Sequence, residues 1–247
     1  MTFYALVVCI FAAAILYSSV GHGGGSGYLA VMALFGVAPE SMRPAALSLN
    51  ILVASIGLVR FYRAGAFSWS HFWPFAVASV PCAFLGSTIT LPIAWFKVLV
   101  GLVLLFAAYR LFVKSTSDTS RPIPIAVALA WGSGLGLLSG LTGVGGGIFL
   151  SPLLLFKNWT TTRQSCGVAA AFILVNSVAG ILGLLSKGSR LPQELPYWLI
   201  AALAGGLLGA ELGSRRLDSS TLRKMLAVVL VISGIKMILD GMSAMLA

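Results

Sequence analysis

Apolar stretches of about 18 residues or longer recur along the whole chain, and each is ended by proline, glycine or a charged residue. A helix of about 20 residues crosses the hydrocarbon core of a bilayer, which is about 30 Å thick. Of the 247 residues, 59% are hydrophobic and 9% are charged, whereas soluble domains carry roughly 25% charged residues. The pattern predicts an all-α integral membrane protein and excludes a sizeable soluble domain.

About ten hydrophobic helical segments are predicted. Their ranges are 3–20, 27–37, 44–63, 70–91, 95–113, 122–141, 147–156, 164–186, 195–216 and 220–242. We expect the first to be a retained helix and not a signal peptide, because no basic residue precedes it and no small-residue cleavage pattern follows it. The polar run KSTSDTSR at 114–121 is the expected linker, so residues 1–113 and 122–247 are predicted to form two halves.

The two halves resemble each other when the chain is shifted by about 122 to 126 residues. The shift places Gly21, Gly23, Gly24 and Gly25 on Gly143, Gly145, Gly146 and Gly147, and it matches Gly57 with Gly180, Pro74 with Pro196 and Gly86 with Gly209. Each half then holds five segments. Because five is odd, the second half must enter the membrane upside down if every segment crosses it, so we predict an inverted repeat.

The distribution of lysine and arginine checks this inversion independently, since cytoplasmic loops hold an excess of both residues. Placing the loop that carries Arg215, Arg216, Arg223 and Lys224 inside puts 11 basic residues inside and 5 outside. The five outside are Arg43, Lys97, Lys187, Arg190 and Lys236. Both termini are then predicted to lie outside.

Two glycine-rich turns, GHGGGSG at 21–27 and TGVGGG at 142–147, each precede a segment of only about 10 or 11 residues. At 1.5 Å per residue, such a segment covers roughly half of the hydrocarbon core. We therefore predict two half-spanning helices, with the glycine turns near the middle of the membrane. Backbone that is not helical at this depth must be buried in protein or line a wet cavity.

The start of each short helix is predicted to bind an anion. Unpaired N–H groups and the positive end of the helix dipole lie there, and glycine lets an anion approach the backbone closely. Two inverted halves bring these two starts together at the centre. The alternative is that the glycines only let helices pack closely. Repetition of the motif before a short segment in both halves favours the anion site.

Polar side chains in the following helices are expected to complete the pocket. The predicted substrate-binding residues are Gly21, His22, Gly23, Gly24, Gly25, Ser26, Ser48, Asn50, Thr142, Gly143, Gly145, Gly146, Gly147, Asn176 and Ser177. Asn50 and Asn176 are expected to face the bundle interior, where they either join helices or contact the substrate. A helical serine commonly bonds its own backbone instead. His22 either protonates when the anion binds or stays neutral beside a carbonyl.

These motifs resemble the TauE/SafE sulfite exporter family, also called the TSUP or DUF81 proteins. That family has a repeated GVGGG-type segment, a short helix with a proline, and then a helix rich in small residues. Here the second copy reads TGVGGGIFLSPLLL (142–155) with CGVAAAFILVNSVAG (166–180), and the first reads GHGGGSGYLAVMAL (21–34) with PAALSLNILVASIG (44–57). The chain departs from the family at His22, and at Ala170 and Ala171, where a Thr-Ser pair is common. These departures bear on the substrate.

The resemblance covers nearly the whole chain and implies transport across the bacterial cytoplasmic (inner) membrane. The substrates it implies are sulfite, sulfoacetate or related sulfur-containing anions, and a coupling proton or ion is a further expected partner. Two alternatives remain at this point. One is a passive anion channel that uses the same glycine turns, and the other is a transporter of another small solute on the same scaffold.

Other classes of protein fit the sequence poorly. The basic residues stand singly or in pairs at helix ends, so the net charge of +10 does not indicate binding to nucleic acid. An enzyme would need paired carboxylates, a metal-binding cluster or a nucleophile with its base. The sequence contains no such pattern, and the spacing of Cys9, Cys82 and Cys166 matches no metal or redox motif. We predict neither an enzyme nor a cofactor.

The acidic residues are expected to form local ion pairs, because oppositely charged residues three or four apart on a helix attract each other. The expected pairs are Glu40 with Arg43, Glu211 with Arg215 and Asp240 with Lys236. They leave no unpaired carboxylate at mid-membrane. This favours an anion over a cation as the solute.

Overall fold

The computed structural model describes residues 2–19, 23–112, 122–214 and 219–246, and these residues form ten helices and no strand. The helices are α1 (Thr2–Ser19), α2 (Gly25–Leu34), α3 (Pro39–Arg63), α4 (Trp69–Thr88), α5 (Ile93–Phe112), α6 (Ile125–Thr142), α7 (Gly147–Phe156), α8 (Thr162–Ser186), α9 (Leu195–Ser214) and α10 (Ser219–Leu246). The predicted all-helical class is confirmed for this part of the chain.

Within the described ranges, three helices are long and apolar enough to cross a membrane. They are Pro39–Arg63, Ile125–Thr142 and Arg163–Ser186. Shorter apolar helices accompany them, including α2 and α7 with 10 residues each. A 10-residue helix is about 15 Å long. The position of α2 and α7 in a bilayer stays a prediction.

The helices of the two halves match in length along the chain. α1 and α6 have 18 residues each, α3 and α8 have 25, and α4 and α9 have 20. The last pair differs, with 20 residues in α5 and 28 in α10. α3 begins at Pro39 and not at residue 44 as predicted. Proline fits the first position of a helix, where its missing N–H leaves no bond unmade, and Pro44 lies inside the helix.

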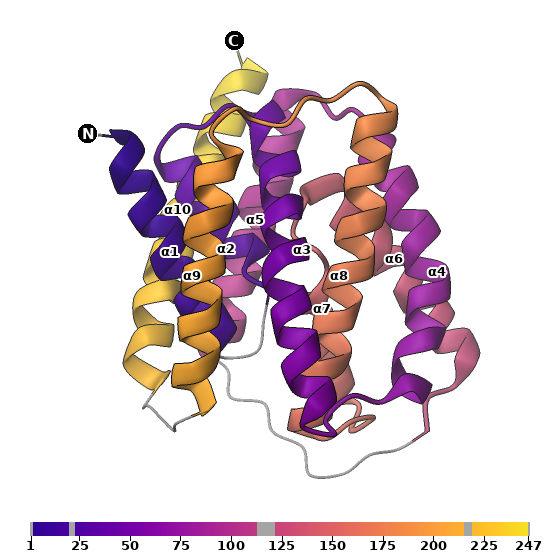
Figure 1. The fold of residues 1–247 in the computed structure, drawn as a ribbon. Helices are drawn as coiled ribbons and strands as arrows, with labels where there is room; N and C mark the ends of the chain where they lie inside the picture. Colours follow the sequence, from indigo (N-terminus) through magenta and orange to yellow (C-terminus); the bar gives the residue numbers. More distant parts are fainter. Residues whose placement is uncertain (1, 20–22, 113–121, 215–218, 247) are drawn as a thin grey trace.

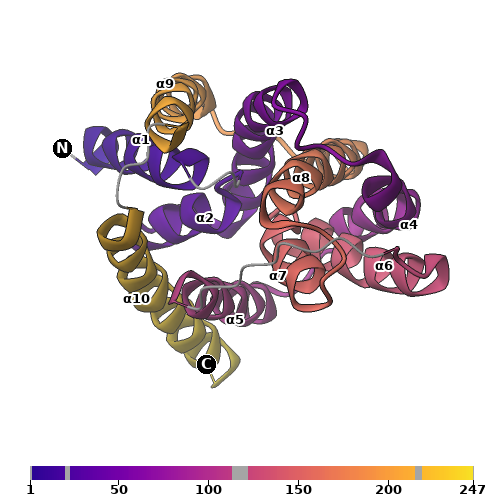
Figure 2. The ribbon, with the colours of Figure 1, turned by 90° about the horizontal axis from the view of Figure 1, so that it is seen from below.

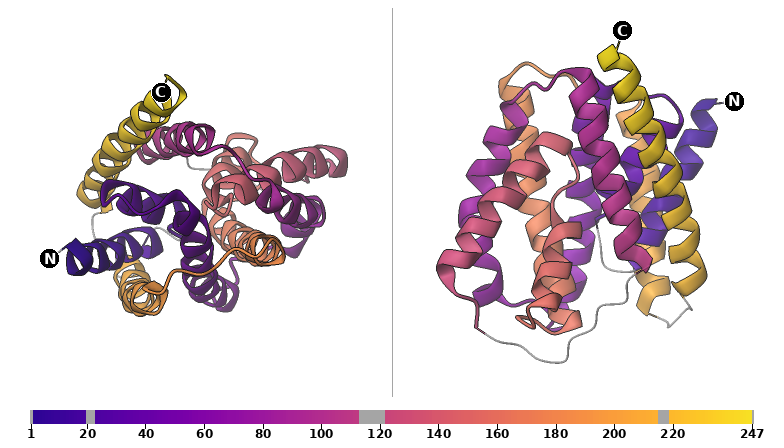
Figure 3. Two further views of the ribbon diagram at one scale, coloured as in Figure 1. Left: turned by 90° about the horizontal axis from the view of Figure 1, so that it is seen from above. Right: turned by 180° about the vertical axis from the view of Figure 1, so that it is seen from behind.

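The first helix of each half lies along the fourth helix of the other half. α1 packs on α9, and α6 packs on α4. The two pairs stand on opposite sides of the bundle, with α3 and α8 between them (Figure 2). α5 and α10 form a further pair, which is seen best from behind (Figure 3). Each half therefore buries its helices against the other half.

Helices α3 and α8 cross the middle of the bundle in opposite directions. Gly57 faces Ala170 near one end of the pair, and Gly180 faces Leu47 nearer the other. α2 leads to the end of the bundle where α3 begins, whereas α7 leads to the opposite end, where α8 begins (Figure 1). The start of α1 and the end of α10 lie at the same end (Figure 1). Which side of a membrane that end faces stays a prediction.

Close packing of α6 on α4 depends on glycine. A Cβ atom at Gly132 would lie 2.6 Å from the carbonyl oxygen of Phe75, and one at Gly136 would meet the backbone of Ser79 closer still. Small residues at such a spacing let two helix backbones approach each other in a membrane, where packing drives helix association. Gly134, on another face of α6, has no atom within 4 Å of its Cβ position.

Replacing Gly136 with Leu should therefore separate α6 from α4, whereas Gly134→Leu makes the same change to the same helix in open space. Inserting side-chain atoms into a packed core costs about 1–3 kcal/mol or more, so we expect a clearly lower melting temperature for Gly136→Leu. Thermal melting of both purified variants in one detergent measures the difference. Equal melting temperatures would show that α6 and α4 do not pack in this way.

Candidate functional site

The two glycine turns meet in the interior of the bundle. Residues 23–30 and 142–148 are buried, and a Cβ atom at Gly25 would meet the carbonyl oxygen of Val144 in the other turn. The predicted meeting of two distant glycine motifs is therefore present in the structure. Gly21 and His22, which belong to the first motif, lie outside the described residues.

Both short helices begin on glycines in the left-handed conformation. Gly24 precedes α2 with φ of 95°, and Gly146 precedes α7 with φ of 77°. Residues with a Cβ rarely adopt this conformation. Neither start has a side-chain cap, whereas α8 has a capping box in which Thr161 and Gln164 bond each other's backbone N–H. The buried starts of α2 and α7 therefore present backbone donors that no side chain caps.

Asn50 on α3 lies between the two turns. Its Nδ2 donates to the carbonyl oxygen of Val144 at 3.2 Å and to that of Gly143 at 3.4 Å. Its Oδ1 is buried and has no hydrogen-bond partner. The Cβ position of Gly145 lies 2.9 Å from Nδ2, and that of Gly23 lies 3.4 Å from Oδ1. One amide thus touches both turns and keeps an unused acceptor between them.

Two predicted polar residues on α8 lie in different surroundings. Ser177 is fully buried, its Oγ has no partner, and it lies 3.2 Å from the Cβ position of Gly145. Asn176 donates from Nδ2 to the carbonyl oxygen of Phe172 in its own helix at 2.8 Å, and its Oδ1 is also unpartnered. Ser177 therefore lies beside the second turn at Gly145, a glycine that Asn50 also approaches, whereas the amide of Asn176 bonds within α8.

Three other predicted side chains make structural bonds. Ser26 shares a hydrogen bond with Tyr17, and Ser48 donates to the carbonyl oxygen of Pro44 at 2.8 Å. Thr142 donates to the carbonyl oxygen of Leu138 at 2.7 Å. Ser48 and Thr142 bond residues four positions earlier, as helical hydroxyls commonly do. Each of these three hydroxyls is already bonded to a partner in a helix, so none of them points to the space between the turns as an unpaired donor.

Apolar side chains that no sequence motif indicated cover several of the glycines. Ile173 on α8 contacts Gly23, Gly145 and Gly147, with its Cδ1 2.5 Å from the Cβ position of Gly147. A shift of 123 residues places Ile173 on Asn50, so the internal repeat indicates position 173 as a counterpart of Asn50 at the site. Rings cover two further glycines, since Tyr28 lies against Gly24 and Phe172 against Gly146.

Two cations donate to the carboxyl ends of helices next to the glycine turns or following them along the chain. The Nη2 atom of Arg43 donates to the carbonyl oxygen of Gly140 at 2.8 Å and to that of Ser87 at 3.0 Å. Lys236 donates from Nζ to the carbonyl oxygens of Ala33 and Leu34, at 2.9 Å and 3.2 Å, where α2 ends. Positive charge is favourable at the carboxyl end of a helix.

The predicted local ion pairs need correction as a result. Arg43 was paired with Glu40 and Lys236 with Asp240, but both cations donate to backbone carbonyls instead. Glu211 approaches a distant residue, with its Oε2 3.8 Å from Nη1 of Arg60 on α3. Its predicted partner Arg215 lies outside the described residues. Spacing along one helix could not reveal carbonyls that other helices bring close.

Comparison with known proteins points to one family. Residues 6–237 match the family model described as "Sulfite exporter TauE/SafE". The probable membrane transporter protein y4hK of Sinorhizobium fredii is 40% identical over 239 residues, which cover 94% of this chain and 97% of that protein. A probable membrane transporter protein of Xylella fastidiosa is 25% identical over 229 residues, 87% of this chain and 85% of that protein. No solved structure matches the chain significantly.

Asn50 should matter more to stability than Asn176, because its amide hydrogen-bonds the second turn to α3. Removing it leaves the buried carbonyl of Val144 without its side-chain donor, and an unmade buried bond costs about 1–3 kcal/mol. Asn176→Ala is a matched control, since Asn176 is equally buried but bonds only its own helix. We expect a lower melting temperature for Asn50→Ala than for Asn176→Ala, and the reverse order would contradict this role.

Proposed function

The chain belongs to the TauE/SafE sulfite exporter family of membrane transporters, and we propose that it is a secondary transporter of small sulfur-containing anions. Sulfite, sulfoacetate and related organosulfonates are the proposed substrates, and the bacterial cytoplasmic membrane is the proposed location. The observation that carries the proposal is the meeting of two buried, uncapped helix starts at glycine turns. Backbone donors and aligned helix dipoles of this kind bind oxyanions.

In this proposal the anion lies between the first residues of α2 and α7. The N–H groups that follow Gly24 and Gly146 would donate to its oxygens. Ser177 would add a hydroxyl donor, since its Oγ is buried without a partner beside Gly145. The amide of Asn50 would contact the anion or fix the separation of the two turns. Backbone donors suit a group with several equivalent oxygens, such as sulfite or a sulfonate.

The two-fold arrangement supports the proposal that residues 1–113 and 122–247 form an inverted repeat. Matched helices have equal lengths in four of the five pairs, as their residue counts of 18, 10, 25 and 20 indicate. Helices α3 and α8 are antiparallel and matched, and so are α5 and α10. Transporters with such repeats bind their substrates at the repeat interface. We place both termini outside on the basis of the charge distribution.

Ile173 distinguishes a carrier from an open channel in this proposal. Its side chain fills the space between Gly23, Gly145 and Gly147, so an anion can bind only when Ile173 withdraws. A site that must open and close around its solute suits alternating access better than continuous conduction. A passive anion channel remains the alternative function, as does transport of another small solute. A proton or ion that drives transport is a further part of the proposal.

Transport in proteoliposomes tests the proposal. Vesicles loaded with sulfite should take up labelled sulfite in a saturable exchange that exceeds the uptake of empty vesicles. A passive channel would instead show current with a reversal potential set by the anion gradient and no stimulation by internal sulfite. If neither sulfite nor a sulfonate moves in either assay, the proposed substrate class is wrong.

Gly147→Ala should separate anion binding from packing. The added methyl group lies at the start of α7, where we place the anion. Its nearest neighbours are Cγ1 and Cδ1 of Ile173, each at 2.5 Å, and the carbonyl oxygen of Ala169 at 3.3 Å. We expect sulfite exchange to fall about tenfold or more. Gly134→Ala, which adds the same group in open space on α6, should exchange sulfite as the parent does.

A double variant distinguishes the two explanations of that loss. Ile173→Ala removes both side-chain atoms that the new methyl group meets, Cγ1 and Cδ1, so Gly147→Ala with Ile173→Ala relieves that clash but keeps the methyl group at the anion site. If the double variant stays impaired relative to Ile173→Ala alone, the anion contacts the start of α7. Recovery of exchange to the level of Ile173→Ala alone would favour the packing explanation.

A further inference from the structure

A groove lies on the surface where α3 ends and α4 begins, beside the middle of α8. It has a volume of about 670 Å³. Aliphatic residues of α3 and α8 line one part of it, and aromatic rings line the rest. These residues are Leu58, Val59, Ala171 and Val175, with the rings of Tyr62, Phe67, Trp69 and Phe72.

The four rings form one cluster. The centroid of Phe67 lies 5.6 Å from that of Phe72, 6.0 Å from Tyr62 and 6.2 Å from Trp69. Tyr62 is 68% exposed and Trp69 is 65% exposed, whereas Phe72 is 6% exposed. Exposed Tyr and Trp at helix ends are typical of the level of the lipid headgroups. The groove therefore extends from that level along apolar side chains.

Arg63 is the charged residue that lines this groove. It is the last residue of α3, it is exposed, and no described acidic side chain forms an ion pair with it. Arg60, one turn earlier, is held by Glu211 instead. A guanidinium thus stands at the mouth of an otherwise apolar groove, at the end of the bundle that the charge distribution places in the cytoplasm.

We propose that this groove binds an anionic phospholipid, with its phosphate on Arg63 and an acyl chain along the aromatic and aliphatic side chains. Guanidinium and phosphate match in charge and in planar hydrogen-bond geometry. Basic pockets between helices on the cytoplasmic side attract anionic lipid headgroups. The proposal does not depend on which solute is transported, because the groove lies outside the glycine turns.

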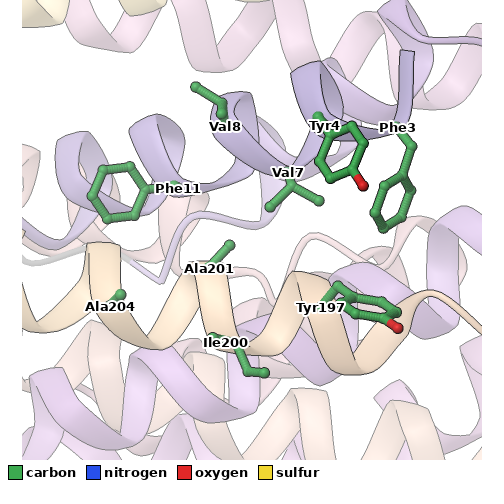
Figure 4. A pocket seen from close by; sticks show the side chains of 9 residues that line it. All are labelled: Phe3, Tyr4, Val7, Val8, Phe11, Tyr197, Ile200, Ala201 and Ala204. Carbon is green, nitrogen blue, oxygen red and sulfur yellow. The ribbon is translucent and has the colours of Figure 1, made fainter. Parts of the chain in front are cut away.

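A second groove provides a comparison. It lies between α1 and α9, has a volume of about 350 Å³ and is lined by residues such as Val8, Phe11 and Ile200 (Figure 4). Among the described residues, no charged side chain lines it. An acyl chain would fit there without any preference for a headgroup, so this groove is an internal control for lipid charge.

Native mass spectrometry of the delipidated, purified protein tests the proposal. Phosphatidylglycerol and phosphatidylcholine with identical acyl chains are the probes, and the ratio of their apparent affinities is the readout. We expect the parent to prefer phosphatidylglycerol by about fivefold or more, and Arg63→Gln to abolish the preference. Arg190→Gln, an exposed arginine outside the groove, is the matched control and should keep it.

Two bulky substitutions test where the lipid lies. Val59→Trp fills the groove beside Arg63 and should weaken phosphatidylglycerol binding at the preferred site although the arginine remains. Val8→Trp makes the same change in the α1 and α9 groove and should leave the preference intact. The proposal is overturned if Arg63→Gln keeps the parent's preference, or if Val59→Trp and Val8→Trp behave alike. Arg63, Arg190, Val59 and Val8 are all exposed, so the four variants should fold.

Discussion

A backbone N–H or C=O without a partner costs several kcal/mol in hydrocarbon, and this constraint governs most of the structure. The chain leaves helical geometry at two buried places, the glycine turns before α2 and α7. Both are covered by side chains of the long helices that follow them, Asn50 on α3 and Ile173 on α8. The long helices thus enclose two short pieces of backbone that no side chain caps, and the antiparallel crossing of α3 and α8 brings those pieces together.

The same constraint acts at the carboxyl ends of helices, where the last carbonyls lack partners within the helix. Arg43 supplies donors to carbonyls of α4 and α6, and Lys236 supplies them to the end of α2. Both cations belong to the five basic residues that the sequence places outside. Because they satisfy carbonyls, their positions are explained by packing as well as by the side of the membrane.

Much of the fold could be predicted because periodic apolar patterns and glycine clusters act locally. α7 was predicted with its observed bounds, and the two glycine motifs were expected to meet. The partners of side chains were harder to predict. Ile173 covers the glycine turns although it carries no polar group, and Arg43 donates to carbonyls of α4 and α6 and not to Glu40. These two cases share a cause, since the neighbour or acceptor comes from a segment that only the folded bundle brings near. Ser48 differs, because its acceptor is the carbonyl oxygen of Pro44 in its own helix.

The packing of first helices on distant fourth helices has a consequence for biosynthesis. α1 leaves the ribosome long before α9, the helix on which its backbone packs through Gly205 and Gly209. The face of α1 that α9 covers therefore lacks its partner until most of the chain has been made. For the same reason, residues 1–113 cannot complete their packing as an independent unit.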